Sequence, residues 1–336
     1  MSLNATAASA PSPQNAQAEM LHFIKNSQPF QVGTYLCYVM TPVTWIVSIF
    51  LIGFIIRGAS KKAAALGDTY SVFMENAFSK INTALVSMSV GIAISFTCLS
   101  LLFTNYGDAT ATDVRNVQFT ILDLSIAIWE SGYCYYIWLR SQGILQRQSK
   151  IVYNLFLFLR VSNPIVFVIQ AASGIYSTFV NTDAANNVHN YIGVTASVAI
   201  IIFDTALLAS FIQYLYQNRG SLDPANSESE AEYLKTVEVT TKMSIISSYG
   251  IVGSIPWMPI PFLLIVAILP SQALNFAMLE AIAFTLAGLC VINLVAMKVR
   301  LESVTEAKIA AEQSNAADKV ELKSYTSNRE KGESKV

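Results

Sequence analysis

Long runs of apolar residues alternate with short polar stretches along this chain, and seven of the runs are long enough to cross a membrane. An α-helix needs about 20 predominantly apolar residues to span the ~30 Å hydrocarbon core of a bilayer. The seven segments cover residues 35–56, 81–103, 116–139, 151–179, 191–216, 243–269 and 273–297. The pattern therefore predicts an all-α membrane protein built as a seven-transmembrane helix bundle.

The Lys and Arg residues lie almost entirely on one side of these segments. Of the 21 such residues, all but Lys25, Arg115 and Arg160 follow the first, third, fifth or seventh segment. Basic residues concentrate in the cytoplasmic loops of membrane proteins. We therefore expect the N-terminus outside the cell and the C-terminus in the cytoplasm.

The composition supports a membrane location. Hydrophobic residues make up 53% of the chain and charged residues 13%, whereas soluble domains carry about 25% charged residues. The formal net charge of −1 gives no reason to expect a nucleic-acid partner. We expect a multi-pass integral protein in contact with membrane lipid, and we expect it in the plasma membrane.

Three regions follow from these boundaries. Residues 1–34 form an extracellular tail, rich in Ala, Ser, Pro, Asn and Gln, that is predicted to be disordered. Residues 35–298 form the transmembrane domain, and residues 299–336 form a cytoplasmic tail that is predicted to be largely disordered. Asn4 begins an Asn-Ala-Thr sequon on the outer side and is a candidate glycosylation site.

Five ionisable side chains lie inside the apolar segments: Asp123, Glu130, Arg160, Asp204 and Glu280. A charge at the bilayer centre costs about 2.5–3.5 kcal/mol on insertion scales, so each group should face the bundle interior and have a partner. Glu130 and Arg160 each lie ten residues, or about 15 Å of helix, from the basic residue that marks the cytoplasmic end of their segment. They are therefore expected to form an intramembrane ion pair, which either only locks helix packing or serves the function.

The remaining carboxylates have no cation left to pair with. Asp123, Asp204 and Glu280 are then protonated, hydrogen-bonded or placed in a wet cavity. A cavity with surplus carboxylates suits a cationic ligand or a proton relay, and a purely structural role is the alternative. Together with Trp257, these three residues form the predicted ligand cavity, which we expect to open outward for an unknown small ligand.

The sixth segment contains three prolines, Pro256, Pro259 and Pro261, which must kink or break its helix. We predict that they form a hinge.

The residues Trp257, Met258 and Pro259 resemble the Trp-x-Pro element of helix six in rhodopsin-like G-protein-coupled receptors. In that family, the kink lets the cytoplasmic half of the helix swing outward, and the Trp lies beneath the ligand pocket. With seven spans and this orientation, the chain is similar to such a receptor.

The resemblance implies signal transduction to a heterotrimeric G protein at the cytoplasmic face. Two family motifs are missing, since the third segment has no Asp-Arg-Tyr and the seventh has no Asn-Pro-x-x-Tyr. Retinal is not expected as a cofactor, because residues 273–297 contain no Lys for a Schiff base.

Other functional classes are weighed on the same residues. The two histidines, His22 and His189, both lie outside the predicted spans, so neither an enzyme nor a metal site is expected, and no cofactor is indicated. A receptor that relays an extracellular signal through movement of the kinked sixth helix is the leading hypothesis. The alternative is a proton-coupled or small-solute transporter, which the acidic residues inside the spans would suit.

Overall fold

The computed structural model describes residues 13–67, 70–108, 112–148, 150–217, 241–242, 244–246, 248–253 and 255–333. Within these ranges all regular elements are helices, so the all-α class predicted from the sequence is confirmed. The candidate glycosylation site Asn4 lies outside the described residues.

Long helices joined by short connections make up most of the chain. In chain order the elements are α1 (Pro13–Asn26), α2 (Gln28–Leu66), α3 (Ser71–Ala77), α4 (Lys80–Thr104), α5 (Thr112–Gln148), α6 (Lys150–Val180), α7 (Asp183–Gln217), the 3-10 turn η4 (Ile255–Trp257), α9 (Ile260–Ile268), the 3-10 stretch η5 (Pro270–Asn275) and α10 (Phe276–Glu333).

Six helical stretches in the described part of the chain are long and apolar enough to cross a membrane. They are Gln28–Leu66, Lys80–Thr104, Lys150–Val180, Asp183–Ser210, Ser244–Ile268 and Phe276–Ala307. Each overlaps one of the apolar segments expected from the sequence. The protein is therefore of the multi-pass membrane type.

The third predicted segment, 116–139, lies in α5 and is not among these six. The helix of 37 residues carries acidic groups at Asp113, Asp123 and Glu130, which lower its hydropathy. It nevertheless packs against α4, α6 and α7 and buries Trp129. A helix covered by protein on several sides tolerates polar residues that lipid would not. The bundle thus has six apolar stretches and one more polar helix among them, not seven equivalent segments.

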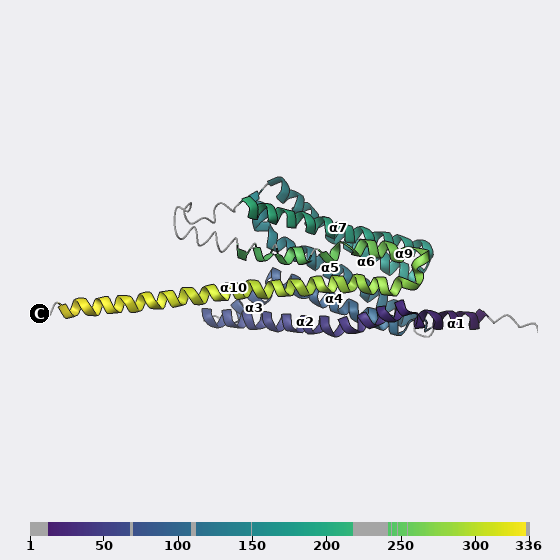
Figure 1. The fold of residues 1–336 in the computed structure, drawn as a ribbon, viewed down its shortest axis with the longest axis horizontal. Coiled ribbons are helices and arrows are strands. Elements are labelled where there is room, and N and C mark those ends of the chain that lie inside the picture. Colours follow the sequence, from purple (N-terminus) through teal and green to yellow (C-terminus); the bar gives the residue numbers. More distant parts are fainter. Residues whose placement is uncertain are drawn as a thin grey trace, which may run out of the picture.

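The long helices lie roughly parallel (Figure 1). α1 and the turn between α9 and α10 lie at one end of the bundle, and the C-terminal part of α10 projects beyond the other end. α2 packs between α4 and α10, and α7 packs against α6 and α9.

Both terminal regions are more helical than predicted. In the 1–34 region, α1 occupies Pro13–Asn26 and α2 begins at Gln28. In the 299–336 region, α10 continues to Glu333, because residues 299–331 contain no Pro or Gly and are rich in the helix formers Ala, Glu and Lys. Near the bundle this extension is held against α2 by an ion pair of 3.2 Å between Glu306 and Lys61.

Small residues set the closest approach of neighbouring helices. A Cβ added at Gly33 of α2 would lie 2.6 Å from the carbonyl oxygen of Ala277 in α10. A Cβ added at Gly91 of α4 would lie 3.0 Å from the Cβ of Trp129 in α5. Such contacts between backbones are possible only where a side chain is missing, and they are typical of packing between membrane helices.

We expect Gly33→Ala to lower the free energy of unfolding by about 1–3 kcal/mol, because the new methyl group overlaps a backbone atom that cannot move without shifting α10. Thermal unfolding of the purified protein in lipid nanodiscs measures the change. Gly53→Ala on the same helix is the matched control, since nothing lies within 4 Å of the added Cβ. Equal stability of the two variants would contradict the proposed close packing of α2 on α10.

Candidate functional site

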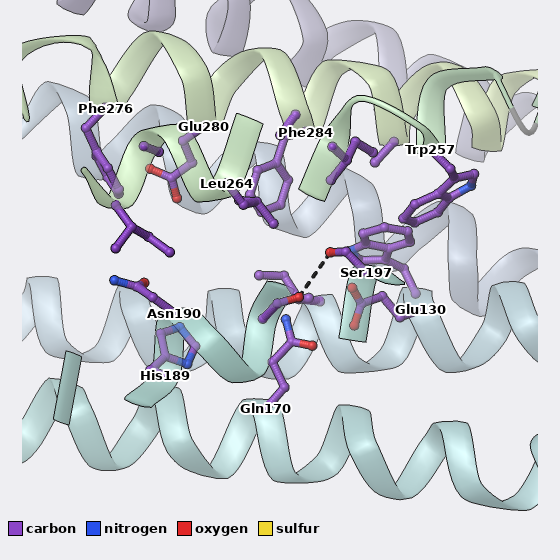
Figure 2. Close-up of a pocket in the computed structure, with 18 residues that line it drawn as sticks. Glu130, Gln170, His189, Asn190, Ser197, Trp257, Leu264, Phe276, Glu280 and Phe284 are labelled. Atoms are coloured by element: carbon purple, nitrogen blue, oxygen red, sulfur yellow. Dashed lines mark hydrogen bonds between the residues drawn. The ribbon is translucent and has the colours of Figure 1, made fainter. Parts of the chain in front are cut away.

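A cavity of about 140 Å³ lies inside the bundle among α5, α6, α7, α9 and α10. This volume can hold several water molecules or a small solute. Its lining comprises 18 residues, which are drawn in Figure 2: Ile126, Trp129, Glu130, Gln170, His189, Asn190, Gly193, Ser197, Trp257, Ile260, Leu264, Ala267, Ile268, Phe276, Glu280, Ala283, Phe284 and Ala287.

The cavity has two distinct ends. Figure 2 shows Phe276, Glu280, His189 and Asn190 at one end, and Glu130, Ser197 and Trp257 at the other. The first end lies close to the connections between α6 and α7 and between α9 and α10. The side chain of His189 is 26% exposed there, so this is the end that communicates with the surroundings.

Trp257 closes the inner end of the cavity. It is 2% exposed, and its ring stacks on Trp129 with centroids 5.5 Å apart and lies 5.3 Å from the ring of Tyr133. Both partners belong to α5. Aromatic pairs at this separation add to the stabilisation from burial. Through these contacts, Trp257 packs the interrupted stretch between α7 and α10 against α5.

The helical stretch that contains Trp257 is interrupted beside it. The 3-10 turn Ile255–Trp257 and the turn at Met258 separate the helical residues 248–253 from α9. Pro256, Pro259 and Pro261 lie in or next to this interruption, where each lacks the N–H that a regular helix would use. The interruption therefore lies at the three prolines, and their action as a hinge stays a prediction.

Two side chains of α10 bind the backbone of the interrupted stretch. Asn293 donates through Nδ2 to the carbonyl oxygen of Tyr249 at 2.7 Å, and the thiol of Cys290 donates to the carbonyl oxygen of Gly253 at 2.6 Å. These bonds hold α10 against the helical residues just before the break. Neither residue could be identified from the sequence, because their role depends on a contact between distant segments.

Two of the four residues predicted to form the ligand cavity line it, namely Trp257 and Glu280. Glu130 also lines it, although it was assigned to an ion pair. Glu130 is 3% exposed, and its Oε2 has no hydrogen-bond partner in the described structure. None of the lining residues is Lys or Arg, so the two glutamates face the cavity without a permanently charged basic partner.

Asp123 is separated from the cavity by His189. Its Oδ1 lies 3.9 Å from Nε2 of His189, and Nδ1 of His189 lies 3.1 Å from the hydroxyl oxygen of Ser173. The carboxyl group packs directly over Gly174, where an added Cβ would overlap it. Asp123 thus belongs to a polar chain that reaches the cavity through the imidazole, and it is not a lining residue.

Asp204 lies elsewhere, next to α5. It is 6% exposed and lies beside the hydroxyl group of Tyr133. It does not line the cavity. Asp204 was predicted in the cavity because it is a carboxylate inside a span with no cation to pair with, but this does not determine which way the helix turns its side chain.

His189 is a cavity residue that the sequence analysis missed. We assigned it to a loop, whereas α7 begins at Asp183 and carries His189 in its second turn. A signal was present, because His189, Gly193 and Ser197 recur every four residues and so share one helix face. This face of α7 is the one that lines the cavity.

The predicted ion pair between Glu130 and Arg160 is wrong. Neither residue has an ion-pair partner in the described structure, and Arg160 instead lies over the rings of Tyr135 and Trp138, 5.1 and 5.8 Å from their centroids. α5 turns one face, with Ile126, Trp129 and Glu130, toward the cavity. The face with Ile128, Ser131, Gly132 and Tyr135 is rotated by about half a turn and lies toward Arg160.

The cavity combines buried carboxylates, an imidazole and aromatic walls with one accessible end. Such an arrangement can bind a small molecule, and its titratable groups can exchange protons. No protein-family model matches this chain, and no curated protein matches it.

We expect a cysteine introduced at Ser197 to react with a small methanethiosulfonate reagent, because Ser197 lines a cavity that opens at His189. The matched control is Ser177→Cys, which is similarly buried (6% against 4% exposed) but does not line the cavity. The native cysteines Cys37, Cys98, Cys134 and Cys290 are all buried, which limits background labelling. Mass spectrometry of the protein in nanodiscs measures the extent of modification. Equal labelling at both positions would contradict an accessible cavity.

Proposed function

We propose that the protein is an integral membrane receptor of the G-protein-coupled type, with seven spans, the N-terminus outside and the C-terminus in the cytoplasm. The observation that carries the proposal is the position of Trp257. This residue forms the inner wall of a cavity that opens at one end of the bundle, and it lies in the interruption of a helical stretch. A ligand in the cavity would therefore press on the part of the chain that is best able to move.

The proposed orientation has two supports. All but Lys25, Arg115 and Arg160 among the 21 basic residues follow segments that would end in the cytoplasm. The accessible end of the cavity is the end at which α1 lies, and the C-terminal part of α10 leaves from the opposite end. In this orientation the cavity opens to the outside. α5 then serves as the seventh span.

Signal relay would begin with the stack of Trp257 on Trp129. A ligand that displaces this ring removes a contact between α5 and the interrupted stretch, and the cytoplasmic part of that stretch is then free to tilt about the prolines. The hydrogen bonds from Cys290 and Asn293 hold the resting position. Two arrangements of one packed element, biased by a ligand, are what a receptor requires.

The charges in the cavity favour a ligand that carries a positive charge. Glu130 and Glu280 line it, and no lining residue is Lys or Arg. The aromatic faces of Trp129, Trp257 and Phe284 can contact a cation as well as an apolar group. The ligand would be small, in keeping with a cavity of about 140 Å³.

A proton-coupled transporter is the second candidate, and the polar chain behind the cavity is the observation in its favour. Ser173, His189 and Asp123 lie in series, and His189 also faces the cavity that holds Glu280. Titratable groups in series inside a membrane protein are typical of proton pathways. In that case substrate uptake would require the carboxylates, and no cytoplasmic signalling partner would be needed.

The orientation predicts that an epitope tag at the N-terminus binds antibody on intact cells, whereas a tag at the C-terminus binds only after permeabilisation. In a cell that glycosylates secreted proteins, Asn4→Gln should remove any mobility shift that a glycosidase removes from the wild type. Fluorescence microscopy and gel mobility measure the two effects. A C-terminal tag accessible on intact cells would contradict the proposed topology.

The receptor proposal predicts that Trp257→Leu changes ligand-independent nucleotide exchange on a heterotrimeric G protein several-fold, because the variant loses the stack that holds the interrupted stretch. Exchange is measured with the protein and purified G proteins in nanodiscs. Trp45→Leu is the matched control, since Trp45 lies on the outer face of α2 and is 37% exposed.

Two outcomes would overturn the receptor proposal. One is that neither the wild type nor Trp257→Leu engages any G protein or other cytoplasmic partner. The other is proton-driven solute uptake by the wild type in liposomes that is lost in Glu280→Gln, which would support the transporter instead.

A further inference from the structure

A second hollow lies on the outer surface of the bundle, between α4, α5 and α6. We call it the α4–α6 groove. It has a volume of about 460 Å³ and is lined by the beginning of α4, by the face of α5 that carries Ile128 and Tyr135, and by Arg160 and Pro164 of α6. Lys80 and Arg160 are its charged residues, and none of the described residues that line it is acidic.

Arg160 is held in place by aromatic rings, not by a carboxylate. Its guanidinium carbon lies 5.1 Å from the ring centroid of Tyr135 and 5.8 Å from that of Trp138. No hydrogen-bond acceptor for it is found among the described residues. A guanidinium carries five N–H donors in a planar fork, and ring contacts leave these donors unused. The group therefore faces the groove ready to bind an anion.

The groove lies at the level where one apolar span ends. Lys80 is the first residue of the span Lys80–Thr104. Arg160 lies ten residues inside α6 and lines the same groove as Lys80. Arg160 therefore shares the groove with a residue at the end of an apolar span, where lipid headgroups lie.

Apart from its two cations the groove is mostly apolar, although Thr83, Ser87 and Ser131 contribute hydroxyl groups, and it faces the lipid side. Ile128 is 51% exposed and contributes to its wall, and Phe78 at its rim is 67% exposed. A ligand with a phosphate at one end and hydrocarbon at the other would match both parts. Small residues such as Ala84 and Gly132 leave room for an acyl chain.

We propose that the α4–α6 groove binds an anionic phospholipid, with its phosphate between Lys80 and Arg160 and an acyl chain along Ile128. Arg and phosphate form bidentate, charge-assisted hydrogen bonds. Anionic lipids are concentrated in the cytoplasmic leaflet, where basic groups near the surface attract them. Only the choice of leaflet rests on the proposed orientation. The lipid site itself is independent of whether the protein is a receptor or a transporter.

Native mass spectrometry tests this proposal. The full-length protein is reconstituted in nanodiscs of phosphatidylcholine that contain a minor fraction of phosphatidylserine. The protein is then released from the nanodisc in the spectrometer, and the lipids that remain bound to it are counted. We expect the wild type to retain phosphatidylserine in preference to phosphatidylcholine, and Arg160→Gln to lower this preference several-fold. Lys150→Gln is the matched control on the same helix, because Lys150 is exposed and does not line the groove.

A second variant keeps the test decisive if Arg160→Gln does not fold. Lys80→Gln changes an exposed residue at the beginning of α4 and should also lower the preference for phosphatidylserine. Equal retention of the two lipids by the wild type, or an unchanged preference in the Lys80 and Arg160 variants, would overturn the site. Inorganic phosphate provides the remaining comparison. It is added at a concentration of negative charge equal to that of phosphatidylserine. If it displaces the lipid, the site binds free phosphate and the lipid assignment is wrong.

Discussion

A helix that is broken by prolines inside an apolar environment leaves backbone groups without helical partners, and side chains of α10 bind the backbone beside this break. Water is absent from the hydrocarbon core, so each unpaired carbonyl or amide must be satisfied by protein. Just before the break, Cys290 binds the carbonyl oxygen of Gly253 and Asn293 binds that of Tyr249. α10 must therefore lie directly against the break.

The same constraint explains the position of the cavity. Because the chain leaves helical geometry at Ile255–Trp257, the indole of Trp257 turns into the bundle and stacks on Trp129 of α5. The interrupted stretch, α5 and α10 then meet around one ring, and the space beyond that ring is not filled by side chains. Trp257 is the contact through which a change in the cavity would reach the break, so the proposed function depends on it directly.

α5 separates two environments with its opposite faces. One face carries Glu130 toward the internal cavity, where the carboxylate has no basic neighbour. The other face carries Tyr135 toward Arg160 and the α4–α6 groove, where the guanidinium has no acidic neighbour. Opposite charges at similar depth are thus kept apart by the body of a helix. Each charge is left available for a ligand from a different side, a small molecule within the bundle and a lipid at its surface.

The amino-acid sequence by itself determined where the helices lie, since hydropathy, length and proline are local properties. It predicted the apolar stretches, the break at Pro256–Pro261 and the burial of Asp123 and Glu130. Tertiary structure alone decided which faces meet, because rotation about a helix axis depends on side chains that are distant in sequence. For that reason Trp257 and Glu280 share a cavity with His189, whereas Asp204 lies beside Tyr133. Arg160 lies on the opposite side of α5 from Glu130, the residue with which it was predicted to pair.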